Sequence, residues 1–306
     1  MALRYIVLDF DGTCTQIDRA YQGFLADYQR IVERANQLAP GALAAAWAAA
    51  RDQVTAASPD AGWTLFEVPS TAPAAADPYI LAFEVAALLR RQGAIRDAPS
   101  DAHGLAYAAN PAPWRPEVAE VLAALVGRGL RVGFISNSEP RGIEARLDEL
   151  LAAAPALRRE VVVLGSAAKF KVRELPVGAA GPGPDHRAQF EQLAGSVRVE
   201  GTVRPIYLRR GAYFDALCEL WQRFDAAEFA SAETLVCGDI WELDLAMPHA
   251  LGAAVHLIRR APPFSSYPYE LAQLADPRDA SDDLTGLVEH VDRLLAGGRP
   301  AVAERL

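Results

Sequence analysis

The chain has 306 residues, of which 51% are hydrophobic and 23% are charged, and its formal net charge at pH 7 is −9. This composition is typical of a globular protein with one large domain or two smaller ones. The negative charge and the lack of a basic run argue against nucleic acids and anionic membranes as partners. No apolar stretch approaches the ~20 residues that span a bilayer.

Cysteine usage and the N-terminal residues indicate the cellular compartment. Cys14, Cys218 and Cys237 are few, odd in number and without metal-ligand spacing. They fit a reducing environment rather than a disulfide framework. Because a secretory signal is also not expected from the first residues, we expect a cytoplasmic protein.

The first third of the chain is predicted to be mostly helical. Residues 4–8 form a short buried strand, and apolar side chains then recur at helical spacing within residues 16–113. The helical patterns cover about 21–32, 41–55 and 79–92, and a loop is expected at 56–78.

From residue 114 onward, helices and strands are predicted to alternate. Strands are expected at 131–135, 161–164, 234–237 and 254–258, and helices at about 116–128, 140–153, 211–226 and 283–295. This alternation indicates an α/β fold with a Rossmann-like parallel sheet. Residues 172–208 break the rhythm and are predicted to be a small β insertion around a Gly/Pro-rich loop at 177–185.

Polar side chains follow three of the predicted strands. In an open parallel sheet, groups just past the carboxyl ends of neighbouring strands converge on one crevice. Two carboxylates at a buried strand end require a compensating cation or proton, although a solvated pair is the alternative. The acids bring neither His nor Cys with them, which favours Mg²⁺ over Zn²⁺. The residues concerned are Asp9, Asp11, Ser136, Asn137, Asp239 and Asp244.

Lysine usage adds a further candidate. Among 30 basic residues only Lys169 and Lys171 are lysines, and they lie two positions apart after the predicted strand 161–164. A lysine is a compact point charge, whereas an arginine is a planar fork. The two lysines in an otherwise Arg-based chain therefore suggest a site that needs the compact cation.

Three motifs resemble those of the haloacid dehalogenase (HAD) superfamily. They are Asp-x-Asp-Gly-Thr after the strand in 5–13, Ser-Asn after the strand in 132–136, and Gly-Asp-x4-Asp in 235–244. The resemblance implies an α/β core of residues 1–15 and 114–306. It also implies that residues 16–113 are an inserted helical cap of the C1 type, as in phosphatase-like members.

The resemblance also implies roles for these residues. Asp9 is then the nucleophile that forms an aspartyl-phosphate, and Asp11 is the general acid/base. Mg²⁺ is held by the Asp9 carboxylate, the Asp11 carbonyl and Asp239, with Asp244 as a further or water-mediated ligand.

The phosphoryl group has its own expected partners. Ser136 is implied to hydrogen-bond it, and the backbone N–H groups around Gly12 and Thr13 are implied to cradle its oxygens. Asn137 and Lys171 are further candidates for substrate binding.

The third motif of the family is the least clear. The family places a Lys, usually at the start of the helix before the fourth motif, but here that position reads Leu-Arg209-Arg210-Gly. We predict that Lys169 supplies the cation. The alternatives are Lys171, or Arg209 or Arg210 with both lysines at the surface.

The predicted activity is Mg²⁺-dependent hydrolysis of a phosphate ester. Asp11 favours phosphate esters over carbon–halogen bonds, because halide leaves without a proton. A large cap predicts that the substrate is a small phosphorylated metabolite. The protein itself is expected to be a monomer or a homodimer. A phosphoryl-transfer mutase, a phosphonate hydrolase and a non-catalytic binding subunit on the same fold are the alternatives.

Overall fold

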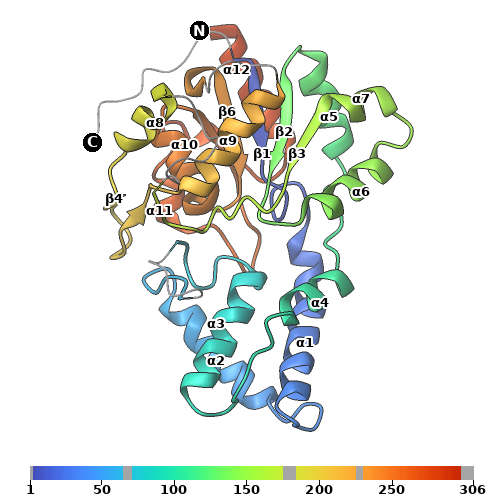
Figure 1. Cartoon of the computed structure of the whole chain (residues 1–306), viewed down its shortest axis with the longest axis vertical. Coiled ribbons are helices and arrows are strands. Elements are labelled where there is room, and N and C mark those ends of the chain that lie inside the picture. The colour runs from blue at the N-terminus through green and yellow to red at the C-terminus, as the bar shows by residue number, and fades with distance from the viewer. Residues whose placement is uncertain (1–2, 65–70, 175–183, 225–229, 298–306) are drawn as a thin grey trace.

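A computed structural model of the protein describes residues 3–64, 71–174, 184–224 and 230–297. Its centre is a six-stranded parallel sheet in the order β3-β2-β1-β6-β7-β8. The central strand β1 pairs with β2 on one side and β6 on the other, so the segments that follow these three strands leave the sheet side by side (Figure 1). The strands are β1 (Tyr5–Leu8), β2 (Arg131–Ile135), β3 (Val161–Leu164), β6 (Thr234–Gly238), β7 (Ala254–Ile258) and β8 (Ala280–Ser281).

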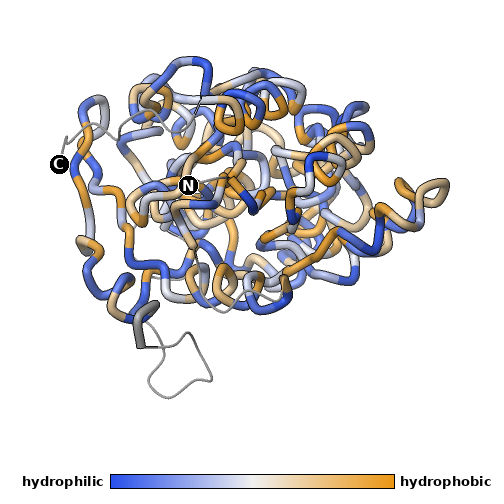
Figure 2. Tube along the Cα trace, turned by 90° about the horizontal axis from the view of Figure 1, so that it is seen from above, coloured by the Kyte–Doolittle hydropathy of each residue, from blue (hydrophilic) through white to orange (hydrophobic). Residues whose placement is uncertain are grey.

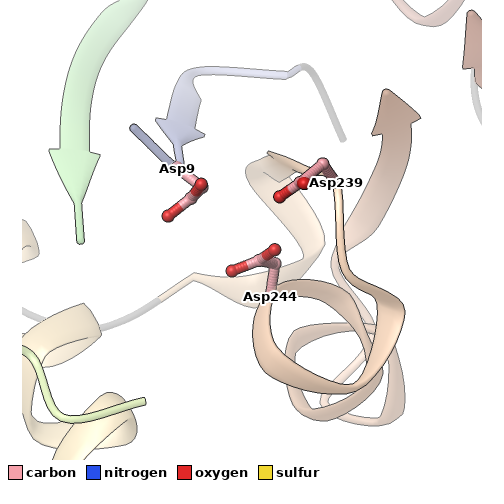
Figure 3. Close-up of side chains that lie close together, drawn as sticks. All are labelled: Asp9, Asp239 and Asp244. Atoms are coloured by element: carbon pink, nitrogen blue, oxygen red, sulfur yellow. The ribbon is translucent and has the colours of Figure 1, made fainter. Parts of the chain in front are cut away.

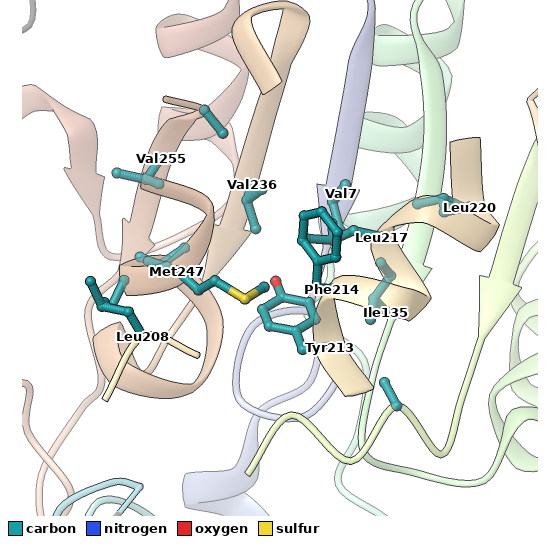
Figure 4. Close-up of a cluster of buried hydrophobic side chains, with 14 of the residues drawn as sticks. Val7, Ile135, Leu208, Tyr213, Phe214, Leu217, Leu220, Val236, Met247 and Val255 are labelled. Carbon is teal, nitrogen blue, oxygen red and sulfur yellow. The ribbon is translucent and has the colours of Figure 1, made fainter. Parts of the chain in front are cut away.

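Both faces of the sheet are buried under helices, as parallel sheets require. Alternate residues of β1 serve the two faces: Tyr5 and Val7 belong to one hydrophobic cluster, and Ile6 and Leu8 to the other. Helix α9 (Gly211–Arg223) covers the first face (Figure 4). The opposite face is covered by α5 (Val118–Gly127), α6 (Pro140–Leu150) and α12 (Thr285–Gly297). The sheet domain also contains the shorter helices α7 (Pro155–Glu160), α10 (Ala246–Ala250) and α11 (Pro268–Leu271).

A bundle of helices lies beyond the carboxyl ends of the strands (Figure 1). It is formed by the packing together of α1 (Ile17–Ala35), α2 (Ala44–Ala57), α3 (Pro78–Arg91) and α4 (Ala102–Ala109). Phe24, Trp47 and Leu89 belong to its hydrophobic cluster, which is separate from the two clusters on the sheet. Figure 2 shows hydrophobic and hydrophilic residues alternating along the peripheral helices, the pattern of helices with one buried face.

Two adjacent linkers connect the bundle to the sheet. Thr15 and Trp114 form an antiparallel bridge, and backbone hydrogen bonds join Gln16 to Pro113 and Arg115 to Cys14. The chain therefore leaves and re-enters the sheet domain through one narrow paired strip, which places the bundle directly over the strand ends.

The region expected to be a β insertion touches the bundle as well. It contains α8 (Pro184–Glu191) and an antiparallel pair of short strands, β4 (Ser196–Val197) and β5 (Ile206–Tyr207). Arg204, in the connection between these strands, is buried and donates to the Pro59 carbonyl at 2.7 Å. The same guanidinium pairs with Glu242 at 2.5 Å, so it links the bundle to the sheet domain.

The predicted α/β fold with a parallel sheet and a helical cap is confirmed. Strands 131–135, 161–164 and 254–258 occur at their predicted limits. The helix expected at 140–153 instead ends at Leu150, and α7 follows it at Pro155 because proline is favoured at a helix start.

Other short elements were not predicted, among them β8, α8 and α4. Part of the Gly/Pro-rich loop at 177–185 and the end of the helix at 211–226 lie outside the described residues. None of the helices in the described part of the chain is both long enough and apolar enough to cross a membrane.

The buried Arg204–Glu242 pair yields a first prediction. Arg204→Met leaves Glu242 as a buried charge without its partner, so we expect the free energy of unfolding to fall by about 3 kcal/mol. Urea denaturation measures this change. Arg223→Met is the matched control, because Arg223 pairs with Glu219 at the surface, where ion pairs contribute little. Equal effects of the two substitutions would contradict the importance of the buried pair.

Candidate active site

Three carboxylates converge at the carboxyl ends of β1 and β6 (Figure 3). Asp9 directly follows β1, Asp239 directly follows β6, and Asp244 lies five residues further on. One oxygen of each lies within 4.8 Å of the others, and all three side chains are buried. The strand pairing therefore brings together acids that are more than 200 residues apart in the chain.

Lys169 lies between two of these acids. Its Nζ is 2.5 Å from Asp9 Oδ1 and 2.5 Å from Asp244 Oδ1, and the residue is only 1% exposed. The ammonium also lies 5.8 Å from the ring centroid of Tyr213, in the first turn of α9. The Tyr213 hydroxyl donates to the Asp244 carbonyl at 2.9 Å. A buried cation thus bridges two buried carboxylates and rests on an aromatic face.

The loop after β3 carries Lys169 to this position through an unusual backbone. Ser166 and Ala168 have φ of 53° and 47°, in the left-handed region that non-glycine residues rarely adopt. Hydrogen bonds to the loop after β2 hold it there: the Asn137 Oδ1 accepts from the Lys169 backbone N–H at 2.7 Å. The N–H groups of Ser166 and Ala167 donate to the carbonyls of Ser138 and Ser136. Such strained backbone persists where its surroundings over-determine it.

The two arginines considered for the same role bind elsewhere. Arg210 is fully buried, and its guanidinium donates to the carbonyls of Lys169 at 3.0 Å, Thr71 at 2.7 Å and Tyr207 at 3.0 Å. Arg209 pairs with the exposed Glu174 at 3.0 Å. Arg210 therefore supports the Lys169 loop from behind, whereas Lys169 itself contacts the acids.

The turn after β1 needs glycine for two reasons. Gly12 has φ of +84°, and a Cβ added there would lie 2.3 Å from Asp239 Oδ2. The turn also fixes the nucleophile candidate, because the Thr13 hydroxyl donates to Asp9 Oδ2 at 3.1 Å. Both oxygens of Asp9 thus have partners, Lys169 on one and Thr13 on the other.

Asp244 is presented by a π-helical turn, Trp241–Leu245. Its Oδ2 accepts from the Ile240 N–H at 3.0 Å, so the carboxylate caps its own turn. A Cβ on Gly238 would lie 2.2 Å from the Asp244 Cβ, which explains the glycine of the Gly-Asp pair. Single π-turns inside helices occur often at functional sites.

Asp11 faces a different set of partners from those of Asp9. Its Oδ2 accepts from the Ser138 hydroxyl at 2.5 Å, and the Tyr107 hydroxyl lies 3.0 and 3.2 Å from its two oxygens. Burial raises the pKa of Asp11 above its usual value, while the hydrogen bonds from Ser138 and Tyr107 oppose that rise. The two acids of the motif thus have different partners: Asp9 pairs with an ammonium and one hydroxyl, whereas Asp11 accepts from two hydroxyls.

The remaining predicted site residues lie at varying distances from this centre. Ser136 is buried at the end of β2, and its Oγ accepts from the Ser138 N–H at 3.1 Å. Asn137 is exposed and contacts the Lys169 backbone, so its observed contact is structural. Lys171 is exposed, in contrast to the buried Lys169. The roles predicted for all of them remain predictions.

The electrostatics of the cluster favour an additional positive charge. Burial raises the pKa of Asp9 to about 7, with Lys169 acting to lower it and Asp244 to raise it. Burial, followed by the charge of Asp244, raises the pKa of Asp239 well above its usual value. Burial acts to lower the pKa of Lys169, but the charges of Asp244 and Asp9 outweigh it and the net shift is upward.

Asp239 provides the observation on which a metal can be tested. Its Oδ2 is buried and has no hydrogen-bond partner within the described part of the chain. An unsatisfied buried carboxylate oxygen is costly, and a cation at this position would satisfy it. The donors are hard oxygens, which suits Mg²⁺. The residues present therefore fit a magnesium ion.

A cavity of about 400 Å³ opens beside the cluster. Gly12 and Asp239 line it from the site, Arg115 and Arg260 from the sheet domain, and Ile17 from the start of the bundle. Its size is at the lower end of the range for small-molecule pockets.

Comparison with known proteins decides the family. Residues 3–252, most of the chain, match the family model for a haloacid dehalogenase-like hydrolase. The chain belongs to this family of hydrolases. The resemblance predicted from the three motifs is thereby confirmed. No curated protein matches this HAD-like chain.

The solved structures that are similar to this chain include proteins named as phosphatases and proteins named as dehalogenases. A predicted phosphoglycolate phosphatase from Haemophilus somnus is 15% identical, with 94% of this chain and 97% of that one covered and a TM-score of 0.49. YfnB from Bacillus subtilis, solved with magnesium bound, is 11% identical, with 95% and 100% covered and a TM-score of 0.49. A dehalogenase is 19% identical, with 94% and 96% covered and a TM-score of 0.44.

Sequence reasoning missed three residues of this site. Ser138 stands in the Ser-Asn-Ser segment after β2, where a second hydroxyl was available as a signal. Tyr213 lies in the first turn of a predicted helix, but an inward aromatic there also fits an ordinary core position. Tyr107 gives no local signal, because its contact with Asp11 depends on how the helical bundle meets the sheet domain.

Crowding of negative charge in the cluster leads to a second prediction. In the absence of divalent metal, Asp239→Asn removes a carboxyl group whose charged form is disfavoured by burial and by Asp244, so we expect the free energy of unfolding to rise by about 1–3 kcal/mol. Thermal or urea unfolding in EDTA measures it. Asp52→Asn is the control, since Asp52 is an exposed acid on α2. A destabilised Asp239→Asn protein would show that the carboxylate is satisfied without metal.

Proposed function

We propose that this HAD-like hydrolase removes phosphate from a small phosphorylated metabolite through an aspartyl-phosphate on Asp9. The observation that carries the proposal is the contrast between Asp9 and Asp11. Asp9 is fixed by Lys169 and Thr13, as a nucleophile must be, while Asp11 is held by hydroxyls that leave it able to exchange a proton.

In the first step, an oxygen of Asp9 attacks phosphorus. A new P–O bond forms to Asp9 while the P–O bond to the leaving group breaks, and the leaving oxygen takes a proton from the Asp11 carboxyl. Lys169 offsets the negative charge of Asp9 and of the approaching phosphate. Ser136 and the N–H groups around Gly12 are the proposed partners of the phosphoryl oxygens.

In the second step, water attacks the phosphorus of the aspartyl-phosphate. Asp11, now a carboxylate, accepts the proton of that water, and the bond between Asp9 and phosphorus breaks to release phosphate. Asp11 thus gives one proton and takes one back, which returns the protein to its starting state.

Asp9, Asp239 and the Asp11 carbonyl are the groups that would hold Mg²⁺, with Asp244 near it. When bound, the ion would supply a charge that offsets the phosphate and the crowded carboxylates. Asp239 is suited to this task because its buried Oδ2 has no hydrogen-bond partner within the described residues. Lys169 contacts Asp9 and Asp244 directly, with Nζ 2.5 Å from one oxygen of each.

Two features support a small substrate. The helical bundle lies over the strand ends and contacts the catalytic loop directly through Tyr107. The cavity beside Asp239 holds about 400 Å³, enough for a small metabolite and too little for a protein surface. Phosphate esters are favoured over carbon–halogen substrates because Asp11 provides a proton that halide does not need.

A screen of small phosphate esters tests this function. With Mg²⁺ present, we expect the wild-type protein to release inorganic phosphate from at least one ester, and Asp9→Asn to lose activity by about 10³-fold or more, since the nucleophile is gone. Phosphate release is measured by a colorimetric assay. Wild-type turnover no greater than that of Asp9→Asn across the screen would refute the hydrolase proposal.

Metal binding has an independent readout. Mg²⁺ in excess over its Kd is expected to raise the Tm of the wild-type protein, because a ligand that binds only the native state stabilises it. Asp239→Asn should show a much smaller rise. The proposed magnesium site would be wrong if Mg²⁺ shifted the Tm of both proteins equally or of neither.

A further inference from the structure

Asp11 belongs to the sheet domain, but one of its partners belongs to the helical bundle. The Tyr107 hydroxyl, on α4, lies 3.0 Å from Asp11 Oδ1 and 3.2 Å from Oδ2. The Ser138 hydroxyl, from the loop after β2, lies 2.5 Å from Oδ2. The two hydroxyls are themselves 3.3 Å apart. The Asp11 carboxylate therefore accepts hydrogen bonds from one residue of each domain, Tyr107 of the bundle and Ser138 of the sheet domain.

These hydrogen bonds fix the orientation of the Asp11 carboxyl group. Ser138 holds one oxygen, and Tyr107 spans both, so rotation of the carboxyl plane breaks at least one hydrogen bond. Proton transfer to a leaving oxygen needs an acid held at a defined distance and angle, and small misplacements reduce the rate strongly. Hydroxyl donors can perform this task without carrying a competing charge.

The position of Tyr107 depends on the bundle as a whole. Its ring is stacked on His103, with centroids 5.9 Å apart, and lies at the edge of Tyr79, with centroids 5.3 Å apart. Helix α4 packs on α1 and ends just before the returning linker (Figure 1). Any movement of the bundle about the linkers therefore moves the Tyr107 hydroxyl relative to Asp11.

We infer that Tyr107 is a positioning residue for Asp11. Through Tyr107, the helical bundle orients the Asp11 carboxyl group that delivers a proton to the leaving group. Ser138 is its partner from the sheet domain. The inference rests on the proposed function, because it assigns Tyr107 to the proton transfer of the first step. It also gives the cap a task in the reaction, in addition to covering the substrate.

The chemistry of the leaving group separates this task from a structural one. During transfer, the P–O bond to the leaving oxygen breaks as the bond to Asp9 forms, and the Asp11 proton moves to that oxygen. Nitrophenolate is a stable anion and departs without the proton, whereas the more basic phenolate needs it. A poorly oriented Asp11 therefore slows phenyl phosphate more than p-nitrophenyl phosphate.

The experiment compares these two esters in Tyr107→Phe. We expect kcat/KM for phenyl phosphate to fall about tenfold, and kcat/KM for p-nitrophenyl phosphate to change by less than about twofold. The ratio kcat/KM is used because it ends at transfer to Asp9 and excludes the later attack of water. Ser138→Ala, which removes the other hydroxyl bound to Asp11, is likewise expected to lower kcat/KM for phenyl phosphate more than for p-nitrophenyl phosphate.

Tyr79→Phe is the matched control. Tyr79 lies in the same aromatic cluster and is buried, whereas Tyr107 is half-buried. The Tyr79 hydroxyl makes no hydrogen bond within the described part of the chain. We expect equal effects on both esters from this substitution. Equal losses for both esters in Tyr107→Phe, or no loss for either, would overturn the positioning role. Failure of the wild-type protein across the whole screen of phosphate esters, these two aryl esters included, would instead refute the proposed function and, with it, this inference.

Discussion

The contact of Lys169 with Asp9 and Asp244 is the interaction on which the site depends. Three buried carboxylates within 4.8 Å of one another repel strongly, and desolvation increases the cost. The ammonium of Lys169 links two of them at 2.5 Å each. The strained loop around Ser166, the support from Arg210 and the face of Tyr213 all serve to keep that charge in place.

The same constraint explains why the site is assembled from four segments. The side chain of a lysine within a strand would point to one face of the sheet and away from the strand ends, where the carboxylates lie. The loop after β3 reaches the edge by running along the loop after β2, to which Asn137 ties it. The third carboxylate, Asp239, is left with a buried oxygen unsatisfied among the described residues, so the protein alone does not balance its own charge. This imbalance supports a bound cation.

Much of the fold followed from the sequence, because strands buried on both faces and capped by polar residues are visible locally. Asp9, Asp239 and Asp244 could be placed together since parallel strands share one carboxyl edge. The rarity of lysine singled out Lys169 and Lys171, and Lys169 was preferred because it is nearer the end of the strand 161–164. The structure places Lys169 against the acids. Tyr107 could not be predicted, because its contact depends on domain packing, and Tyr213 resembles a core residue. Strand β8 could not be predicted either, because its two residues are too few to show an alternating hydrophobic pattern.

The scarcity of lysine makes the central claim directly measurable. Labelling the side-chain nitrogens of lysine with ¹⁵N gives only two Nζ signals, which Lys171→Arg assigns. If Lys169 bridges Asp9 and Asp244, its signal should remain that of a slowly exchanging ammonium above the pH at which a free lysine deprotonates, about 10.4. Asp9→Asn should shift this signal and leave that of Lys171 in place. A Lys169 signal that exchanges rapidly, deprotonates near that pH and ignores Asp9→Asn would contradict the account.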